Sequence, residues 1–318
     1  MDQESAKSRK PEIWAVGSGK GGTGKSFLTS SLGTYLAAKG SRVILIDADL
    51  GGANLHTVLG IAKPKNTLTD FFEKKIPLSE VIVECGIPNL RLVSGLLSSV
   101  TSEYINHAQK LKFFRHIQAL DADYILIDLG AGCNANTIDT FLLAAKKIVV
   151  TTPELTALEN MYHFIKNVYF RKLKKVVAEH GLKDSAQKVL NNREAHAIKT
   201  FRDLMVCLED LSPEIRKVLD EEMSGLLMHI VVNQTRSSYD VEMGLNIESV
   251  CMKFLGLSAV YAGHIDHDDF VARCINKKQH FLISYAFSNT AKEIGLLSEA
   301  IRDGRRINGG DIYADRRI

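Results

Sequence analysis

The residues best suited to chemistry lie between Gly17 and Ser26, in the run Gly-Ser-Gly-Lys-Gly-Gly-Thr-Gly-Lys-Ser. From Gly19 this run matches G-x-x-x-x-G-K-[ST], the phosphate-binding loop pattern, between an apolar stretch at 13–16 and a helix-like segment at 27–39. Glycines let successive backbone N–H groups turn toward phosphate oxygens, and the start of the next helix attracts negative charge. The run therefore predicts a nucleotide-binding loop.

Each part of the loop has an expected task. Lys25 supplies a positive charge to the β- and γ-phosphates, and the hydroxyl of Ser26 is suited to bind Mg²⁺. The predicted nucleotide-binding residues of the loop are Gly19, Lys20, Gly21, Gly22, Thr23, Gly24, Lys25, Ser26 and Phe27. The alternatives are a ligand-free glycine turn and a dinucleotide-binding G-x-G-x-x-G loop, but Lys25 and Ser26 favour phosphate binding.

Carboxylates follow two further apolar runs. Asp47 and Asp49 come after the run at 43–46, and Asp128 ends the run at 124–127. Ligands of open α/β sheets bind at the carboxyl ends of such strands. We expect Asp128 to hold a water molecule on Mg²⁺, and one of Asp47 and Asp49 to serve the metal while the other orients an attacking water. An Asp-Gly turn without a ligand is the simpler alternative for 47–52.

Apolar runs alternate with helix-like segments along the chain, which predicts an α/β fold: three layers, with a mostly parallel central sheet flanked by helices. We expect a disordered tail at 1–10, a single nucleotide-binding domain at 11–302 with a helical insertion at about 168–225, and a flexible tail at 303–318. Within this domain, Thr156 and Glu159 form a capping-box pattern at a helix start, and the segment 78–85 is expected to be a short helix.

Composition narrows the class of protein. The 318 residues carry a net charge of +3, which gives no bulk signal for nucleic-acid binding. No apolar run approaches the roughly 18 residues of a membrane-spanning helix. The five cysteines are widely separated, which favours a reducing cytoplasm and argues against a disulfide framework, a zinc site or an iron–sulfur cluster. His264 to Asp269 contains metal-binding residue types at irregular spacing, and helix capping by its aspartates is the preferred interpretation.

The run from Lys20 to Ser26 resembles the deviant phosphate-binding loop of the MinD/ParA family of dimerising ATPases. The resemblance covers roughly residues 13–301. It implies ATP and Mg²⁺ as cofactors and a homodimer with ATP between the subunits. In that family the early lysine reaches the nucleotide of the partner subunit, so Lys20 and Lys25 are both implied to be catalytic.

Other segments extend the resemblance to the family's switches. The run at 47–54 resembles switch I, which implies that Asp49 positions the catalytic water and that Asp47 lies nearer to the metal. The run at 128–132 resembles switch II, whose last glycine, Gly132, offers its N–H to the γ-phosphate; much of the family has proline at the place of Gly130. Asn233 follows an apolar run, where its amide suits the adenine base, and the family uses an asparagine there.

The sequences at 151–156 and 231–237 are similar to the flagellar-number regulators of this family, the FlhG and FleN branch. This implies an ATP-driven switch that controls the number or placement of flagella, with a protein partner such as a flagellar GTPase or a polar factor. A ParA-like partitioning ATPase, with DNA bound at the basic run 171–175, and a nucleotide-bound adaptor without hydrolysis are the alternatives. Peripheral contact with the inner face of the cell membrane is also implied, but the tail at 303–318 has the composition of a poor membrane helix.

Overall fold

The computed structural model describes residues 10–49, 52–95, 107–191 and 201–306. The tail at 1–9, residues 50 and 51 of the aspartate-rich loop, residues 96–106 and 192–200, and the C-terminal end from 307 lie outside the described residues. The described part contains one eight-stranded sheet with the strand order β3-β4-β2-β5-β1-β6-β7-β8. The strands are β1 (Glu12–Gly17), β2 (Val43–Ala48), β3 (Ile82–Glu84), β4 (Leu90–Val93), β5 (Tyr124–Leu129), β6 (Lys146–Thr151), β7 (Met228–Thr235) and β8 (Ala259–Asp266).

The sheet is parallel except at one edge, where β3 pairs antiparallel with β4. Its central strands are buried along almost their whole length, as expected of a sheet covered on both faces. The predicted α/β fold with a mostly parallel sheet is confirmed. The helix expected at 78–85 is partly wrong, since the chain leaves the helix after Val81 and pairs Ile82–Glu84 with β4.

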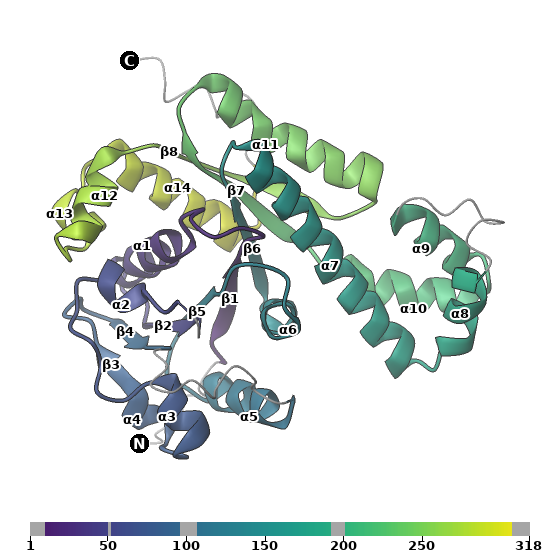
Figure 1. The fold of residues 1–318 in the computed structure, drawn as a ribbon, viewed down its shortest axis with the longest axis horizontal. Coiled ribbons are helices and arrows are strands. Elements are labelled where there is room, and N and C mark those ends of the chain that lie inside the picture. Colours follow the sequence, from purple (N-terminus) through teal and green to yellow (C-terminus); the bar gives the residue numbers. More distant parts are fainter. Residues whose placement is uncertain (1–9, 50–51, 96–106, 192–200, 307–318) are drawn as a thin grey trace, which may run out of the picture.

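Helices cover both faces of the sheet (Figure 1). One face packs against α1 (Lys25–Ala38), α2 (Leu55–Val58), α12 (Asp269–Asn276), α13 (Phe281–Ser284) and α14 (Asn289–Asp303). The other packs against α3 (Leu68–Glu73), α4 (Leu78–Val81), α5 (His107–Gln118), α6 (Ala135–Leu143), α7 (Leu155–Glu179) and α11 (Ser238–Val250), which continues as a π-helical turn at Cys251–Leu255. No helix of the described chain is long and apolar enough to cross a membrane.

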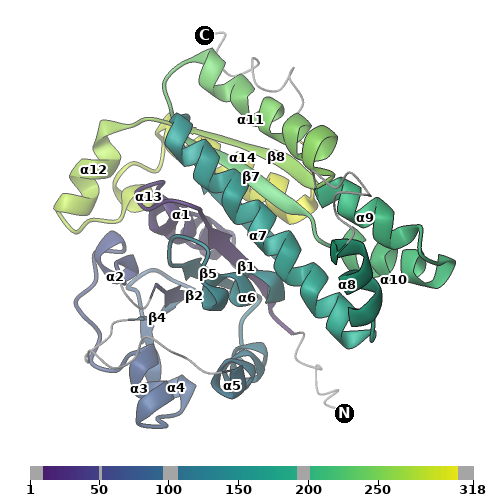
Figure 2. The same cartoon turned by 45° about the vertical axis from the view of Figure 1, so that its right-hand side comes forward.

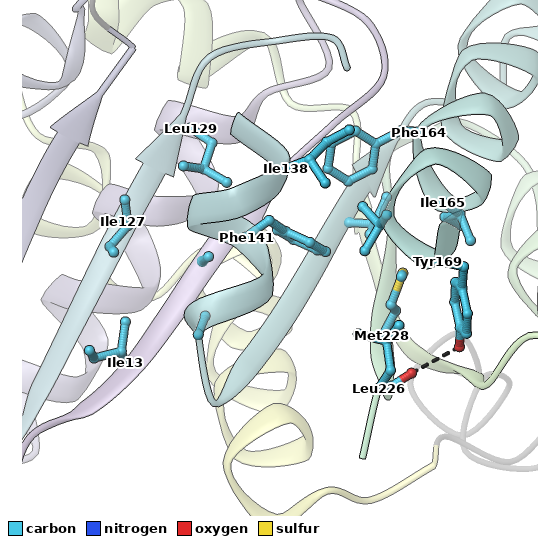
Figure 3. Close-up of a cluster of buried hydrophobic side chains, with 14 of the residues drawn as sticks. Ile13, Ile127, Leu129, Ile138, Phe141, Phe164, Ile165, Tyr169, Leu226 and Met228 are labelled. Carbon is cyan, nitrogen blue, oxygen red and sulfur yellow. Dashed lines mark hydrogen bonds between the residues drawn. The ribbon is translucent and has the colours of Figure 1, made fainter. Parts of the chain in front are cut away.

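The second face has a deep core beneath α6 and α7 (Figure 3). Phe141 from α6 and Phe164 from α7 meet edge to face, with ring centroids 5.1 Å apart. Tyr169, also on α7, donates a hydrogen bond of 2.9 Å to the carbonyl oxygen of Leu226, two residues before β7. These contacts fix the N-terminal half of α7 on the sheet and therefore place its first turn beside the loop that follows β1.

The helical insertion gathers around the C-terminal half of α7 (Figures 1 and 2). The expected range of about 168–225 begins inside α7, so we keep the name insertion for the three helices that follow it: α8 (Lys183–Asn191), α9 (Phe201–Glu209) and α10 (Pro213–Ser224). Helix α10 begins at Pro213, which occupies its first turn, and Ser212 before it accepts a hydrogen bond from the backbone N–H of Ile215. Buried side chains of α9 and α10 belong to the same core as those of α7.

Candidate functional site

Strand register brings the predicted site residues to one edge of the sheet. Asp128 on β5 lies opposite Val16 on β1 and opposite Asp47 on β2. The glycine-rich loop leaves β1 immediately after this level, at Gly17. The loop and the carboxylates are therefore neighbours because parallel strands end together.

The loop has a backbone that requires glycine at two of its positions. Gly24 has φ of 92° and precedes α1, and a Cβ there would lie 2.1 Å from Nδ2 of Asn233. A Cβ on Gly19 would lie 2.0 Å from the backbone oxygen of Asn160 on α7. Larger residues at either position would push the loop away from β7 or from α7.

Lys25 points into the protein. It is buried, and its Nζ donates a hydrogen bond of 3.1 Å to Oγ of Ser18, whose hydroxyl in turn donates to the carbonyl oxygen of Lys20 at 2.6 Å. Burial lowers the pKa of Lys25, and the nearby Asp128 and Asp49 oppose that shift. The loop thus holds its inner lysine in a defined position beside two carboxylates.

Ser26 and Asp128 are joined directly. The hydroxyl of Ser26 donates to Oδ2 of Asp128 at 2.5 Å, and the hydroxyl of Thr29, one turn further along α1, lies 3.5 Å from Oδ1. Burial raises the pKa of Asp128 to about 6, with Asp49 adding to the rise and Ser26 and Lys25 opposing it. This pair of oxygen donors has the chemistry that Mg²⁺ prefers.

Asp47 organises the loop that follows β2. It is fully buried, and its two carboxylate oxygens accept backbone N–H groups from Asp49 at 3.2 Å and from Leu55 at 3.0 Å. Burial raises the pKa of Asp47 to about 7, and the nearby Asp128 adds to the rise. In this arrangement Asp47 positions the loop, and its role at a metal stays a prediction.

Asp49 and Gly132 lie on the two loops that carry the predicted switches. A Cβ added to Gly130 would come within 3.2 Å of Oδ1 of Asp49, so the half-buried Asp49 carboxylate borders the loop after β5. The N–H of Gly132 donates to the carbonyl oxygen of Ser18 at 3.0 Å. The backbone donor expected to reach a γ-phosphate is therefore bonded to the glycine-rich loop in this structure.

Lys20 points away from Lys25. Its Nζ donates hydrogen bonds of 3.0 Å to Oε2 of Glu154 and to Oγ1 of Thr156, at the start of α7. The expected capping box at Thr156 is wrong, because the helix already begins at Leu155 with Glu154 at its N-cap. The hydroxyl that was expected to cap the helix instead accepts a hydrogen bond from Lys20.

A cavity of about 440 Å³ opens beside the loop, which is a size typical of ligand pockets. Its lining includes the predicted residues Gly21, Gly22, Gly24, Lys25, Ser26, Phe27, Asp49 and Asn233. The buried Asn233 donates from Nδ2 to the carbonyl oxygen of Thr23 at 2.8 Å, so it also braces the loop. The far wall comes from the end of β8 and from Val271, Ala272 and Ile275 of α12.

The site fits a Mg²⁺-bound nucleotide. The loop at Gly24 has no room for a side chain, and the buried Lys25 next to it supplies a positive charge for phosphates. The hydrogen-bonded pair of Ser26 and Asp128 supplies oxygen ligands for a divalent cation. The hydroxyl of Thr23 is buried in the loop with no partner within the described residues. Two carboxyl groups with raised pKa values indicate a place where added positive charge would be stabilising.

Three residues of this arrangement were not predicted from the sequence. Ser18 connects Lys25 to the loop backbone, Thr29 adds a hydroxyl beside Asp128, and Glu154 holds Lys20. The position of Thr29, three residues after Ser26 on a helix, is a usable signal because both side chains then project from one face. The other two depend on loop geometry and on a contact across 134 residues.

The run from His264 to Asp269, which contains residue types found in metal sites, has a structural role. Asp268 caps α12 by accepting the N–H of Phe270 at 2.8 Å, as preferred from the sequence. His264, Asp266 and Glu293 offer ligand atoms within 4.8 Å of one another, but Asp266 accepts a hydrogen bond from Thr235 and Glu293 accepts the backbone N–H of Asp266. These bonds tie the end of β8 to β7 and α14.

The basic run at 171–175 is engaged in ion pairs. Arg171 makes two hydrogen bonds of 2.8 Å to the buried Asp139 of α6, and Lys175 lies 3.4 Å from the same carboxylate. Lys172 pairs with Glu222 of α10 at 2.5 Å. Three of the four cations that suggested DNA binding therefore hold the insertion and α6 to α7.

The family model described as "ParA: NUBPL iron-transfer P-loop NTPase" matches residues 10–178. The chain belongs to the ParA family of P-loop NTPases. The match ends within α7, so it contains the glycine-rich loop and all three aspartates but neither the helical insertion nor Asn233.

Curated relatives of this ParA-family chain include flagellar proteins. The flagellum site-determining protein YlxH of Helicobacter pylori is 38% identical over 155 residues, which is 48% of this chain and 52% of that protein. The antiactivator FleN of Pseudomonas aeruginosa is 34% identical over 158 residues, or 49% of this chain and 55% of that protein. The matched stretch thus spans about half the length of these relatives.

The fold of the chain is that of MinD and ParA structures. The septum site-determining protein MinD of Pyrococcus horikoshii, complexed with Mg-ADP, superimposes with a TM-score of 0.60 and 20% identity. The superposition covers 92% of this chain and 96% of MinD. At this identity the likeness establishes the fold alone.

Proposed function

We propose that this chain is a Mg²⁺-dependent ATPase that dimerises around ATP and separates after hydrolysis. The proposal rests on one arrangement at the glycine-rich loop. Lys25 is buried beside the hydrogen bond between Ser26 and Asp128, whereas Lys20 points away from it and bonds to Glu154. One lysine is positioned for the nucleotide of its own subunit. The other is exposed at the edge of the loop, where a second subunit could be reached.

Each side chain has a role in the proposed reaction. Lys25 binds the β- and γ-phosphates, and Ser26 and Asp128 hold the cation, which supplies charge neutralisation of the phosphates when bound. Asp49 orients the attacking water from the loop held by Asp47, because its carboxylate lies at the cavity wall. Asn233 holds the loop and presents the remaining part of its amide to the base.

The proposed cellular role is control of flagellar number or placement, with a protein partner. It is supported by the similarity to YlxH and FleN in the half of the chain that carries the switches. The partner would recognise the dimer, because dimerisation changes the surface around Lys20 and α7. Counting flagella in native cells that lack the gene, with the wild type or the Lys20→Ala chain returned, tests this role; unchanged flagellation in the deletion would contradict it.

Iron transfer, which appears in the description of the family model, finds no support in the cysteines. The five are free, and Cys85, Cys251 and Cys274 are buried. Burial raises the pKa of Cys85 and of Cys251 to about 12, whereas a cluster needs closely placed thiolates. The nucleotide site is therefore the basis of the proposed function.

The deciding experiment is the molar mass in solution, measured by light scattering with ATP and Mg²⁺ and with ADP, for the wild type and Lys20→Ala. We expect a dimer only with ATP for the wild type and a monomer for the variant, with Lys39→Ala, at the exposed C-cap of α1, as the matched control. A wild-type mass that ignores the nucleotide would overturn the switch. Together with absent phosphate release, it would favour a nucleotide-bound adaptor.

A further inference from the structure

One imidazole and two carboxylates meet where β8 ends. His264 and Asp266 lie two residues apart on this strand, so their side chains project to the same side of it, and Glu293 comes from α14. Each of the three offers one ligand atom, and these atoms all lie within 4.8 Å of one another. All three residues are half-buried. A nitrogen and two oxygens, brought together by two elements, form a ligand set of the kind that binds a metal ion.

The spacing of His264 and Asp266 suits an ion between them. Nε2 of His264 lies 4.0 Å from Oδ1 of Asp266, whereas a hydrogen bond would join these atoms at about 2.7–3.2 Å. Metal bonds measure about 2.0–2.1 Å to an imidazole nitrogen and about 2.0–2.2 Å to a carboxylate oxygen, so one ion can contact both atoms where they stand. An approach of roughly 0.7 Å would give a tetrahedral angle at the metal.

Hydrogen bonds already orient both carboxylates. The hydroxyl of Thr235, on β7, donates to Oδ1 of Asp266 at 2.5 Å, and the backbone N–H of Asp266 donates to Oε2 of Glu293 at 3.0 Å. A carboxylate has about four lone-pair sites, so one hydrogen bond leaves room for a metal. Ligating carboxylates in metal sites are typically hydrogen-bonded in this way, because the outer partners fix the ligands before the ion binds.

We propose that His264, Asp266 and Glu293 bind one transition-metal dication, with Zn²⁺ as the expected ion. An imidazole ligand suits zinc, whereas Mg²⁺ prefers oxygen ligands throughout. Three protein ligands leave a fourth position of the tetrahedron for a water molecule. None of the three ligands is a cysteine, so the wide separation of the cysteines does not bear on this site.

The zinc site is distinct from the proposed Mg²⁺ ligands and borders the nucleotide cavity. Ser26 and Asp128 offer oxygens only, from α1 and β5, whereas Asp266 lies in the cavity lining at the end of β8. A bound ion would join β8 to α14 directly and to β7 through Thr235, and would thereby make this wall of the cavity more rigid. Zinc binding to the nucleotide-free chain does not depend on the proposed ATPase activity.

The test is isothermal titration calorimetry of the full chain with ZnCl₂, after EDTA has removed metal and without nucleotide. Excess Mg²⁺ in the buffer competes for sites made of oxygens alone. We expect one Zn²⁺ to bind per chain. Glu293→Gln should weaken binding on the order of 100-fold, because it removes the charged ligand but keeps an oxygen that accepts the N–H of Asp266. His264→Gln should have an effect of the same size.

Two further variants separate zinc binding from folding. Thr235→Val removes the hydroxyl that orients Asp266 and should weaken binding about tenfold. The matched control, His267→Gln, removes the neighbouring imidazole, whose Nδ1 lies 3.9 Å from Asp269, and should bind zinc as the wild type does. Thermal unfolding without zinc checks that each variant is folded. The visible spectrum of Co²⁺ added in place of zinc should show no thiolate absorption.

Several results would overturn the zinc site. A wild-type chain that takes up no zinc, or binding by His264→Gln and Glu293→Gln that equals the wild type, would leave the three side chains as an ion-paired brace. Binding abolished by excess Mg²⁺ would place the ion at the oxygen ligands. Loss of binding in His267→Gln alone would assign it to His267 and Asp269, and thiolate absorption would assign it to a cysteine. Each outcome is read without ATP, so it is independent of whether the chain is an ATPase.

Discussion

The inner and outer sides of the loop between β1 and α1 differ sharply. On the inner side, Lys25 is buried, bonded to Ser18 and close to two carboxylates. On the outer side, Lys20 is exposed and paired with Glu154 and Thr156 across 3.0 Å each. The two lysines are five positions apart in one loop, yet only one of them faces the cavity.

This difference shows which parts of the site the fold positions before any ligand binds. The inner groups are held by burial and by hydrogen bonds that solvent does not screen, so the fold itself sets their positions. The outer pair is an exposed ion pair, a kind of contact that contributes at most about 1 kcal/mol and exchanges partners readily. The inner side is therefore suited to binding and the outer side to switching.

The largest expected effect comes from removing the inner lysine. Lys25→Ala should weaken ATP binding about 10- to 100-fold, because charged hydrogen bonds to the phosphates are lost. Titration of a fluorescent ATP analogue measures this, with Lys39→Ala, at the exposed C-cap of α1, as the control. Unchanged affinity would mean that the phosphates do not lie at the inner side.

Removing the water-positioning carboxylate tests the inner side a second way. Asp49→Ala should lower kcat on the order of 100-fold while ATP binding stays near the wild-type level, because Asp49 is proposed to act on water and not on the phosphates. Phosphate release and analogue titration measure the two quantities separately. We also expect the ATP-bound dimer to persist longer. Normal turnover would show that another group orients the water.

A buried histidine at the start of α13, away from the loop, predicts sensitivity to acid. His280 bonds to Thr34 of α1, and burial lowers its pKa to about 4, whereas an unfolded histidine titrates near 6.5. The unfolded chain therefore binds the proton first, so stability present above pH 6.5 is lost as the pH falls toward 4. Between pH 6.5 and pH 4, the free energy of unfolding measured with urea should fall by on the order of 2 kcal/mol less for His280→Gln than for the wild type. The exposed control His163→Gln should behave as the wild type does.

The smallest expected effect is on the outer side. Glu154→Gln removes the charge that holds Lys20, and we expect a two- to fivefold rise in the ATP-dependent dimer, in line with the weakness of exposed ion pairs. Sedimentation velocity across a range of protein concentrations measures it. Glu159→Gln, an exposed change of the same kind on α7, is the control. A weaker dimer would show that Glu154 contributes directly to the subunit contact.

Much of the fold follows from local pattern. The central strands are runs of consecutive apolar residues, which is the pattern of strands buried on both faces of a sheet. Their positions and their alternation with helices were therefore predictable. The edge strand Ile82–Glu84 was not, because three residues carry no periodicity and their state is decided by pairing with β4. The capping box at Thr156 failed for a similar reason, since a distant lysine uses its hydroxyl.

The candidate site was predictable where spacing along the chain determines geometry. The loop pattern places Lys25 and Ser26, and strand ends place Asp47 and Asp128 at one level. The hydrogen bonds from Asn233 to Thr23 and from Gly132 to Ser18 join residues far apart in the sequence, and no local pattern announces them. Both Asn233 and Gly132 were therefore assigned only to binding the nucleotide, and their contacts with the loop were not predicted.

The contact of Gly19 with Asn160 has a mechanical consequence. The loop touches the second turn of α7, and the same 25-residue helix carries the insertion at its other end. At 1.5 Å per residue the helix is a lever about 37 Å long, so a tilt of roughly 5° at its first turns moves the far end by about 3 Å. A tilt of α7 at its first turns would therefore displace α8–α10, at the far end of the helix (Figure 1), more than the loop itself.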